Sequence, residues 1–119
     1  MYYTTTVRLS TEGTPARPLS GVQVGLFDRD LFTRDDHLGT ETTDTDGEAC
    51  FRFSSEDFTD FDDRFGGENP DLYVIVYDAD GETVLSTRAE PEEGSAQRVL
   101  TVRIPEELAS RHRLLTPSV

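Results

Sequence analysis

Four carboxylates stand close together in a segment that follows a strand-like run. Asp28, Asp30, Asp35 and Asp36 fall within nine residues, directly after the alternating apolar positions of residues 22–27. Carboxylates this crowded repel one another, so the segment needs water, salt or a bound cation to be compact. Ca²⁺ takes six to eight oxygen ligands. Asp28, Asp30 and Asp36 could supply three of them, which makes the segment a candidate calcium site.

Two further aspartates could complete such a site. Asp63 and Asp71 belong to an acidic, irregular stretch over residues 54–71, and they would reach the site if this stretch folds against the same end of the molecule. A second interpretation stays open, in which these aspartates cap turns and form side chain–backbone bonds on a solvated acidic surface. The sequence alone does not choose between the two.

Other catalytic chemistry has little support in the sequence. His37 and His112 are the two histidines, and neither stands at a readable spacing from a serine and an acid that would form a nucleophilic triad. Cys50 is the single cysteine, which excludes an intramolecular disulfide and a thiolate metal cluster. Its position in a strand-like run predicts a packed or half-buried thiol. We therefore expect a protein that is not an enzyme.

The net charge limits the classes of partner. The 119 residues carry a formal charge of −13, and the eleven basic residues are all arginine. This charge argues against binding to nucleic acid, and against contact with anionic lipid unless a bound cation inverts the local charge. The sequence shows no signal peptide and no run long enough to span a membrane. We therefore expect a cytoplasmic protein or an excised module of an exported one, without direct membrane insertion.

Short apolar runs alternate with turn signals along most of the chain. The pattern predicts seven strands, with the third and fourth pairing across Asp46 and Gly47. They are expected at residues 4–9, 22–27, 37–43, 48–53, 72–78, 83–87 and 97–104. Strands at this spacing favour an all-β sandwich with Greek-key connections. We assign this sandwich domain to residues 1–105.

The last part of the chain differs from the rest. Pro105 followed by Glu106 and Glu107 is typical of a helix start, and basic residues at 111–113 suit the last turn. Residues 106–119 are thus predicted to form a C-terminal helical segment, or else a frayed tail.

Several motifs in this order resemble transthyretin-like (prealbumin-like) domains. A Pro-Leu-x-Gly-Val turn at residues 18–22 precedes Asp-x-Asp-Leu, Asp-Asp-x-Leu-Gly and Thr-Asp-x-Asp-Gly, and Asn-Pro-Asp-Leu-Tyr-Val at 69–74 leads into a later strand. The resemblance covers about residues 4–104. It implies a transthyretin-like sandwich, a fold that hosts many functions.

The enzymes of that fold are not matched by this chain. The purine-pathway hydrolases of the family use several histidines and end in Tyr-Arg-Gly-Ser, whereas this chain has two histidines and ends in Leu-Thr-Pro-Ser-Val. Intradiol dioxygenases of similar fold bind iron through two tyrosines and two histidines, and no such cluster appears around His37 or His112. The resemblance therefore does not imply either activity.

A second, local resemblance concerns the acidic segments. The spacing Asp28-x-Asp30-x5-Asp36-x-x-Gly39 is similar to a calcium loop of synaptotagmin-type phospholipid-binding domains, and residues 63–74 look like their other acidic loop. The two loops occur along this chain in the reverse of their order in those domains. This resemblance implies calcium as a ligand.

Taken together, these features predict a non-enzymatic interaction or structural module. We expect it to contact a protein partner, or a second copy of itself, through an edge strand or a loop end, with its acidic loops ordered by Ca²⁺ or salt. The alternative is a calcium-switched binder of phospholipid headgroups or acidic glycans.

Overall fold

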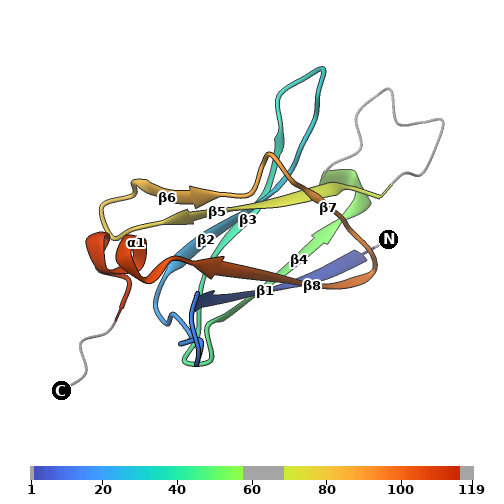
Figure 1. Cartoon of the computed structure of the whole chain (residues 1–119). Coiled ribbons are helices and arrows are strands. Elements are labelled where there is room, and N and C mark those ends of the chain that lie inside the picture. The colour runs from blue at the N-terminus through green and yellow to red at the C-terminus, as the bar shows by residue number, and fades with distance from the viewer. Residues whose placement is uncertain (1, 58–68, 116–119) are drawn as a thin grey trace.

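Alternation of apolar and polar side chains produces most of the strands that were expected. The computed structural model describes residues 2–57 and 69–115 (Figure 1). Within these residues the strands are β1 Tyr2–Thr11, β2 Gln23–Asp28, β3 Asp36–Thr42, β4 Glu48–Ser54, β5 Asp71–Tyr77, β6 Thr83–Ser86, β7 Glu92–Glu93 and β8 Gln97–Ile104. A 3-10 turn, η1 Ser55–Asp57, follows β4, and helix α1 spans Glu106–Arg111. The two-residue strand β7 was not expected from the sequence.

The strands form two sheets that face each other. One sheet has the order β4-β1-β8, with β1 antiparallel to β4 and parallel to β8. The other has the order β3-β2-β5-β6, in which neighbours are antiparallel, and β7 pairs with β5. Figure 1 shows the two layers lying one above the other. The all-β sandwich is therefore confirmed.

The core fills the space between the sheets. Because side chains alternate between the two faces of a strand, each sheet contributes every second residue. Buried side chains of this kind include Val7, Leu9, Val24, Leu26, Phe51, Phe53, Leu72, Val74, Val76, Leu100, Val102 and Ile104. Cys50 lies on the opposite face of β4 from Phe51 and is exposed, so the prediction of a packed or half-buried thiol was wrong.

The connection from β3 to β4 also differs from the prediction. β3 pairs with β2, and β4 pairs with β1, so the expected hairpin between them does not form. The turn is present, because Asp44 accepts the amides of Asp46 and Glu48, but it carries the chain from one sheet to the other. Gly47 is needed there, since a Cβ would lie 2.5 Å from the Leu9 carbonyl oxygen and its φ is +77°.

Helix α1 packs against one end of the sandwich. Ala109 and Leu114 are buried in the core, and Leu108 and Leu115 are partly buried against it. A short helix therefore occupies Glu106–Arg111, the first part of the segment 106–119 that was predicted to be helical or a tail. Within the described residues, no helix is long and apolar enough to cross a membrane.

Thr43, in the connection between β3 and β4, forms hydrogen bonds to the residues that precede β2. Its side chain is buried, its hydroxyl donates to the Leu19 carbonyl oxygen at 2.6 Å, and it accepts the Val22 amide at 3.0 Å. Thr43→Val should lower the free energy of unfolding by about 2–4 kcal/mol, because it leaves a buried donor and acceptor unpaired. Urea denaturation measures this loss. The exposed neighbour Thr42→Val should change stability by about 0.5 kcal/mol or less, and an equal loss in both variants would contradict this role.

Candidate functional site

The loop between β2 and β3, residues 29–35, presents two large apolar side chains to solvent. Phe32 is 95% exposed and Leu31 is 71% exposed. Figure 1 shows this hairpin projecting beyond the two sheets. We call residues 29–35 the tip loop. Single exposed apolar residues are ordinary on a protein surface, whereas two adjacent ones at a projecting tip make it a candidate contact site.

Asp30 shapes the tip from inside the loop. Its Oδ1 atom accepts the amide of Phe32 at 2.8 Å and the amide of Thr33 at 3.1 Å. This is an Asx-type turn, in which a short side chain replaces a backbone acceptor. The two bonds fix the backbone that carries Leu31 and Phe32.

Asp35 holds the tip loop to the rest of the sandwich. Arg88 donates to both of its carboxylate oxygens, from Nε at 2.7 Å and from Nη2 at 3.2 Å. The hydroxyl of Tyr73 donates to Oδ2, and the Asp30 amide donates to Oδ1 at 2.9 Å. The Arg88 bonds hold the pKa of Asp35 well below its usual range, and the Tyr73 bond adds to this effect. Asp35 in turn raises the pKa of Arg88.

Tyr73 belongs to an aromatic stack on the outer face of the five-stranded sheet. Phe27 lies between Tyr73 and His37, with ring centroids 5.2 and 4.9 Å apart. A Cβ at Gly25 would lie 2.8 Å from the Phe27 ring, so the glycine leaves room for it. Burial, together with the bond to Asp35, raises the pKa of Tyr73 to about 12. The tyrosine therefore stays protonated and remains a donor to the carboxylate.

Asp28 occupies the last position of β2, where the strand leaves the sandwich. Its Oδ1 atom accepts the Asp71 amide at 2.9 Å. Burial raises the pKa of Asp28 to about 7. The bond from the Asp71 amide lowers this pKa, whereas the nearby negative charges of Asp36, Asp71 and Asp30 raise it further. Asp28 is therefore a partly protonated carboxyl at neutral pH.

The structure brings together several of the aspartates expected to bind calcium. Asp28 and Asp36 face each other as register partners of β2 and β3, and Asp71 starts the strand on the other side of β2. Asp30 directs one carboxylate oxygen at the amides of the tip, and Asp63 lies outside the described residues. The calcium site at Asp28, Asp30, Asp36, Asp63 and Asp71 stays a prediction.

A different set of metal-ligating side chains converges elsewhere. Among the described residues, Asp78, Glu82 and His112 have ligand atoms that all lie within 4.8 Å of one another. From the sequence, His112 was expected in the last turn of a C-terminal helix or in a tail, with no link to Asp78. The two residues are 34 positions apart, so the packing of α1 had to be known before they could be joined.

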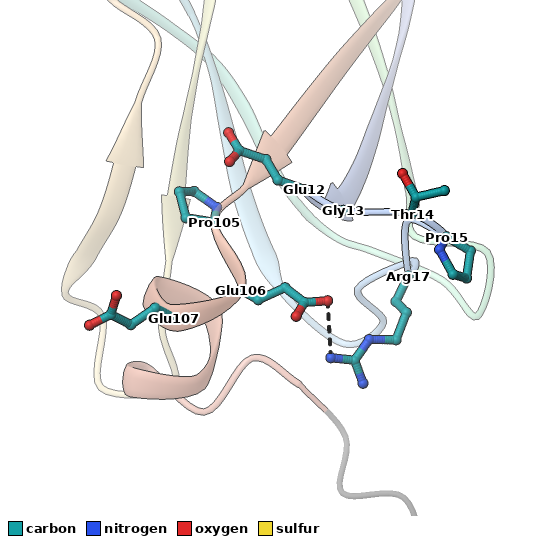
Figure 2. Close-up of a pocket in the computed structure, with 8 residues that line it drawn as sticks. All are labelled: Glu12, Gly13, Thr14, Pro15, Arg17, Pro105, Glu106 and Glu107. Carbon is teal, nitrogen blue, oxygen red and sulfur yellow. Dashed lines mark hydrogen bonds and ion pairs between the residues drawn. The ribbon is translucent and has the colours of Figure 1, made fainter.

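Surface hollows offer further candidates. The hollow in Figure 2, about 580 Å³, lies where the β1–β2 connection meets the start of α1, and its Arg17–Glu106 ion pair measures 3.4 Å. Its other carboxylates are Glu12 and Glu107, and its lining contains no histidine, serine or cysteine. A second hollow, about 590 Å³, opens between β5, β6 and β8 and is lined by aliphatic side chains together with the polar residues Ser86, Thr87, Glu90, Glu92 and Thr101. Neither arrangement resembles a catalytic centre.

Sequence reasoning missed the residues that organise the tip loop. Asp35 was noted as one acid among four, while Arg88 and Tyr73, its partners from distant segments, carried no signal that linked them to it. The exposure of Leu31 and Phe32 was readable in principle, because the pair interrupts a polar segment without the alternation of a strand.

Comparison with known proteins gives one informative similarity. No protein-family model and no curated protein matches this chain. The chain is similar in structure to a 9R-lipoxygenase from Cyanothece PCC8801, with a TM-score of 0.53 and 26% sequence identity. The similarity covers 87% of the present chain. It spans 17% of that lipoxygenase chain. The similarity places this protein among β-sandwich proteins, and the finer resemblance to transthyretin-like domains stays a prediction.

The raised pKa of Asp28 makes stability depend on pH. Because the folded state holds the Asp28 proton more tightly than the unfolded state, this carboxyl destabilises the fold progressively as pH rises from about 4 to about 7. In chelator, Asp28→Asn should be more stable than the wild type by about 1–2 kcal/mol at pH 8, allowing for solvent screening, and nearly equal to it at pH 4. Urea denaturation at the two pH values measures the difference.

Asp46→Asn supplies the matched control, since it removes one negative charge from an exposed turn. Its effect should be similar at both pH values. An Asp28→Asn variant whose gain is the same at pH 4 and pH 8 would contradict the assignment of a partly buried, raised-pKa carboxyl.

Proposed function

We propose that this protein is a non-enzymatic binding module that contacts a partner protein through the tip loop. The observation that carries the proposal is the exposure of Phe32 and Leu31 side by side at a projecting loop. Removing such side chains from water favours association by about 25 cal/mol for each Å² of apolar surface buried. Aromatic and aliphatic anchors of this kind supply much of the binding energy of protein interfaces.

The loop is organised before any partner arrives. Asp30 fixes the tip backbone, and Asp35 ties the base of the loop to Tyr73 and Arg88. Binding therefore pays little conformational entropy for ordering this loop, and preorganisation of this kind strengthens association.

The contact surface continues from the tip along the edge of a sheet. Two side chains cover far less than the roughly 800 Å² that each partner buries in a stable interface. Among residues 2–57 and 69–115, β3 is the outermost strand of its sheet next to the tip loop, and β2 is the strand that it pairs with. The outer edge of this strand could pair with a strand of the partner. The strongly negative charge further favours a neutral or basic partner.

The calcium-switched lipid binder remains the second candidate. It is favoured by the pairing of Asp28 with Asp36 beside an apolar tip, and by the similarity to part of a lipoxygenase, whose name places its activity on lipid. A cation held by these carboxylates would offset the repulsion between this acidic protein and anionic headgroups.

Photo-cross-linking distinguishes the two candidates. With p-benzoylphenylalanine in place of Phe32, irradiation in an extract of the source cells should join the protein to a discrete protein partner, because residue 32 would lie inside the contact. The same photoreactive residue in place of Thr45, exposed in the β3–β4 turn, is the matched control and should not give that product. Adding Leu31→Ser to the first variant should reduce the yield severalfold.

Other outcomes would contradict the proposal. Cross-links from position 32 to lipid alone, present with Ca²⁺ and lost with chelator, would replace it with the lipid-binding alternative. Equal cross-linking from positions 32 and 45 would show that the tip is not a specific contact. Both variants should keep the wild-type melting temperature, since both positions are exposed.

A further inference from the structure

We propose that Asp78, Glu82 and His112 form a binding site for a divalent transition metal ion, with Zn²⁺ as the best match. The three side chains come from the turn between β5 and β6 and from the residue that ends α1. This site lies at the opposite end of β5 from the tip loop, and the inference does not rest on the proposed function.

Asp78 is the fixed ligand of the group. It is a buried residue, only 8% exposed, and its Oδ1 atom accepts the amides of Asp80 and Glu82, each at 2.9 Å. These bonds close the β5–β6 turn and orient the carboxylate. The second oxygen, Oδ2, is directed at Nδ1 of His112 at 2.9 Å.

His112 is brought to Asp78 by the packing of α1. Its amide donates to the Leu108 carbonyl oxygen at 3.1 Å, and Ala109 and Leu114, on either side of it in the chain, are buried in the core. The imidazole is itself largely shielded, with 19% of its side chain exposed. The ligand is therefore held by the helix and does not depend on a free tail.

Glu82 completes the group from the outer side. Its amide is bonded to Asp78, its carboxylate lies within 4.8 Å of the other two ligand atoms, and the residue itself is exposed. The ligand atoms lie within 4.8 Å of one another, whereas ligand atoms around tetrahedral zinc are ~3.3–3.5 Å apart. Zinc would need a contraction toward Glu82 and a slight opening of the Asp78–His112 contact, both within reach of side-chain rotation.

The chemistry of the three ligands selects the ion. Imidazole suits Zn²⁺ and its neighbours in the transition series, whereas Ca²⁺ and Mg²⁺ prefer oxygen ligands alone. Two carboxylates carry a charge that a divalent ion would neutralise. A hollow of about 340 Å³, lined by Asp78, Tyr77 and Arg113, borders the site and leaves room for a water molecule as the fourth ligand. Such an ion would clamp α1 to the β5–β6 turn.

Isothermal titration calorimetry with Zn²⁺ alone tests the site. The full chain, freed of metal with chelator, should bind one Zn²⁺, and its melting temperature should rise by several degrees, because the ion binds the native state. Glu82→Gln should weaken binding at least tenfold. This variant keeps the fold because Glu82 is exposed and it is the backbone amide, not the side chain, that bonds to Asp78.

Matched variants separate this site from incidental binding. Two control variants should bind Zn²⁺ as the wild type does. Glu90→Gln makes the same change at an exposed position of another turn, and His37→Gln replaces the other histidine. His112→Gln should weaken binding at least tenfold, as Glu82→Gln does. The proposal would be overturned by an absence of saturable binding, or by binding that survives Glu82→Gln and is lost in His37→Gln. Either result would leave Asp78 and His112 as a structural hydrogen-bonded pair.

Discussion

The carboxylate of Asp35 is the interaction on which the tip loop depends. It joins three parts of the chain that are distant in sequence, since it accepts bonds from the loop amide of Asp30, from Tyr73 on β5 and from Arg88 in the segment after β6. A paired guanidinium and carboxylate form strong charge-assisted bonds with a defined geometry. A loop of seven residues with mostly exposed side chains could not acquire a fixed shape from apolar packing, so these bonds supply it.

Strand β5 links this loop to the other end of the molecule. It pairs with both β2 and β6 within its sheet, and its core-facing side chains are buried. Tyr73 near its start supports the tip loop, and Asp78 directly after its end receives His112. The two sites are therefore held by one of the most buried strands of the sandwich, which gives each of them a rigid support while separating them by the length of the strand.

The sequence predicted the strands well because their signal is local. Val24 and Leu26, or Leu72 and Val74, alternate with side chains on the other face, and the bounds found in the structure differ by one or two residues from those expected. The predicted pairing of β3 with β4 was wrong, because β4 joins the other sheet. Asp46 and Gly47 make the same tight turn whether the strand that follows stays in the sheet or leaves it. A turn motif fixes the direction of the chain over four residues and contains no information about the partner of the next strand.

The residues of the candidate sites were predicted less well, for a related reason. The crowding of acidic residues around Asp28 is visible in the sequence. The sequence does not show which carboxylate is buried, which one pairs with an arginine and which one accepts the amides of a turn, because these roles depend on contacts across the sheets. Asp35 and Asp36 are adjacent in sequence, yet Asp35 bonds to Arg88 while Asp36 lies opposite Asp28. The group around His112 likewise arises from the packing of α1, which no local pattern specifies.

The most direct test of this account is the exchange rate of the backbone amides in the tip loop. If Asp30 and Asp35 fix the loop, the amides of Asp30, Phe32 and Thr33 should exchange with solvent deuterium more slowly than an unstructured chain of the same sequence, although Phe32 and Thr33 are exposed. Asp35→Ala should abolish the protection of the Asp30 amide, a change on the order of tenfold for a lost charge-assisted bond. Exchange of all three amides at the unstructured rate in the wild-type protein would contradict a preorganised tip.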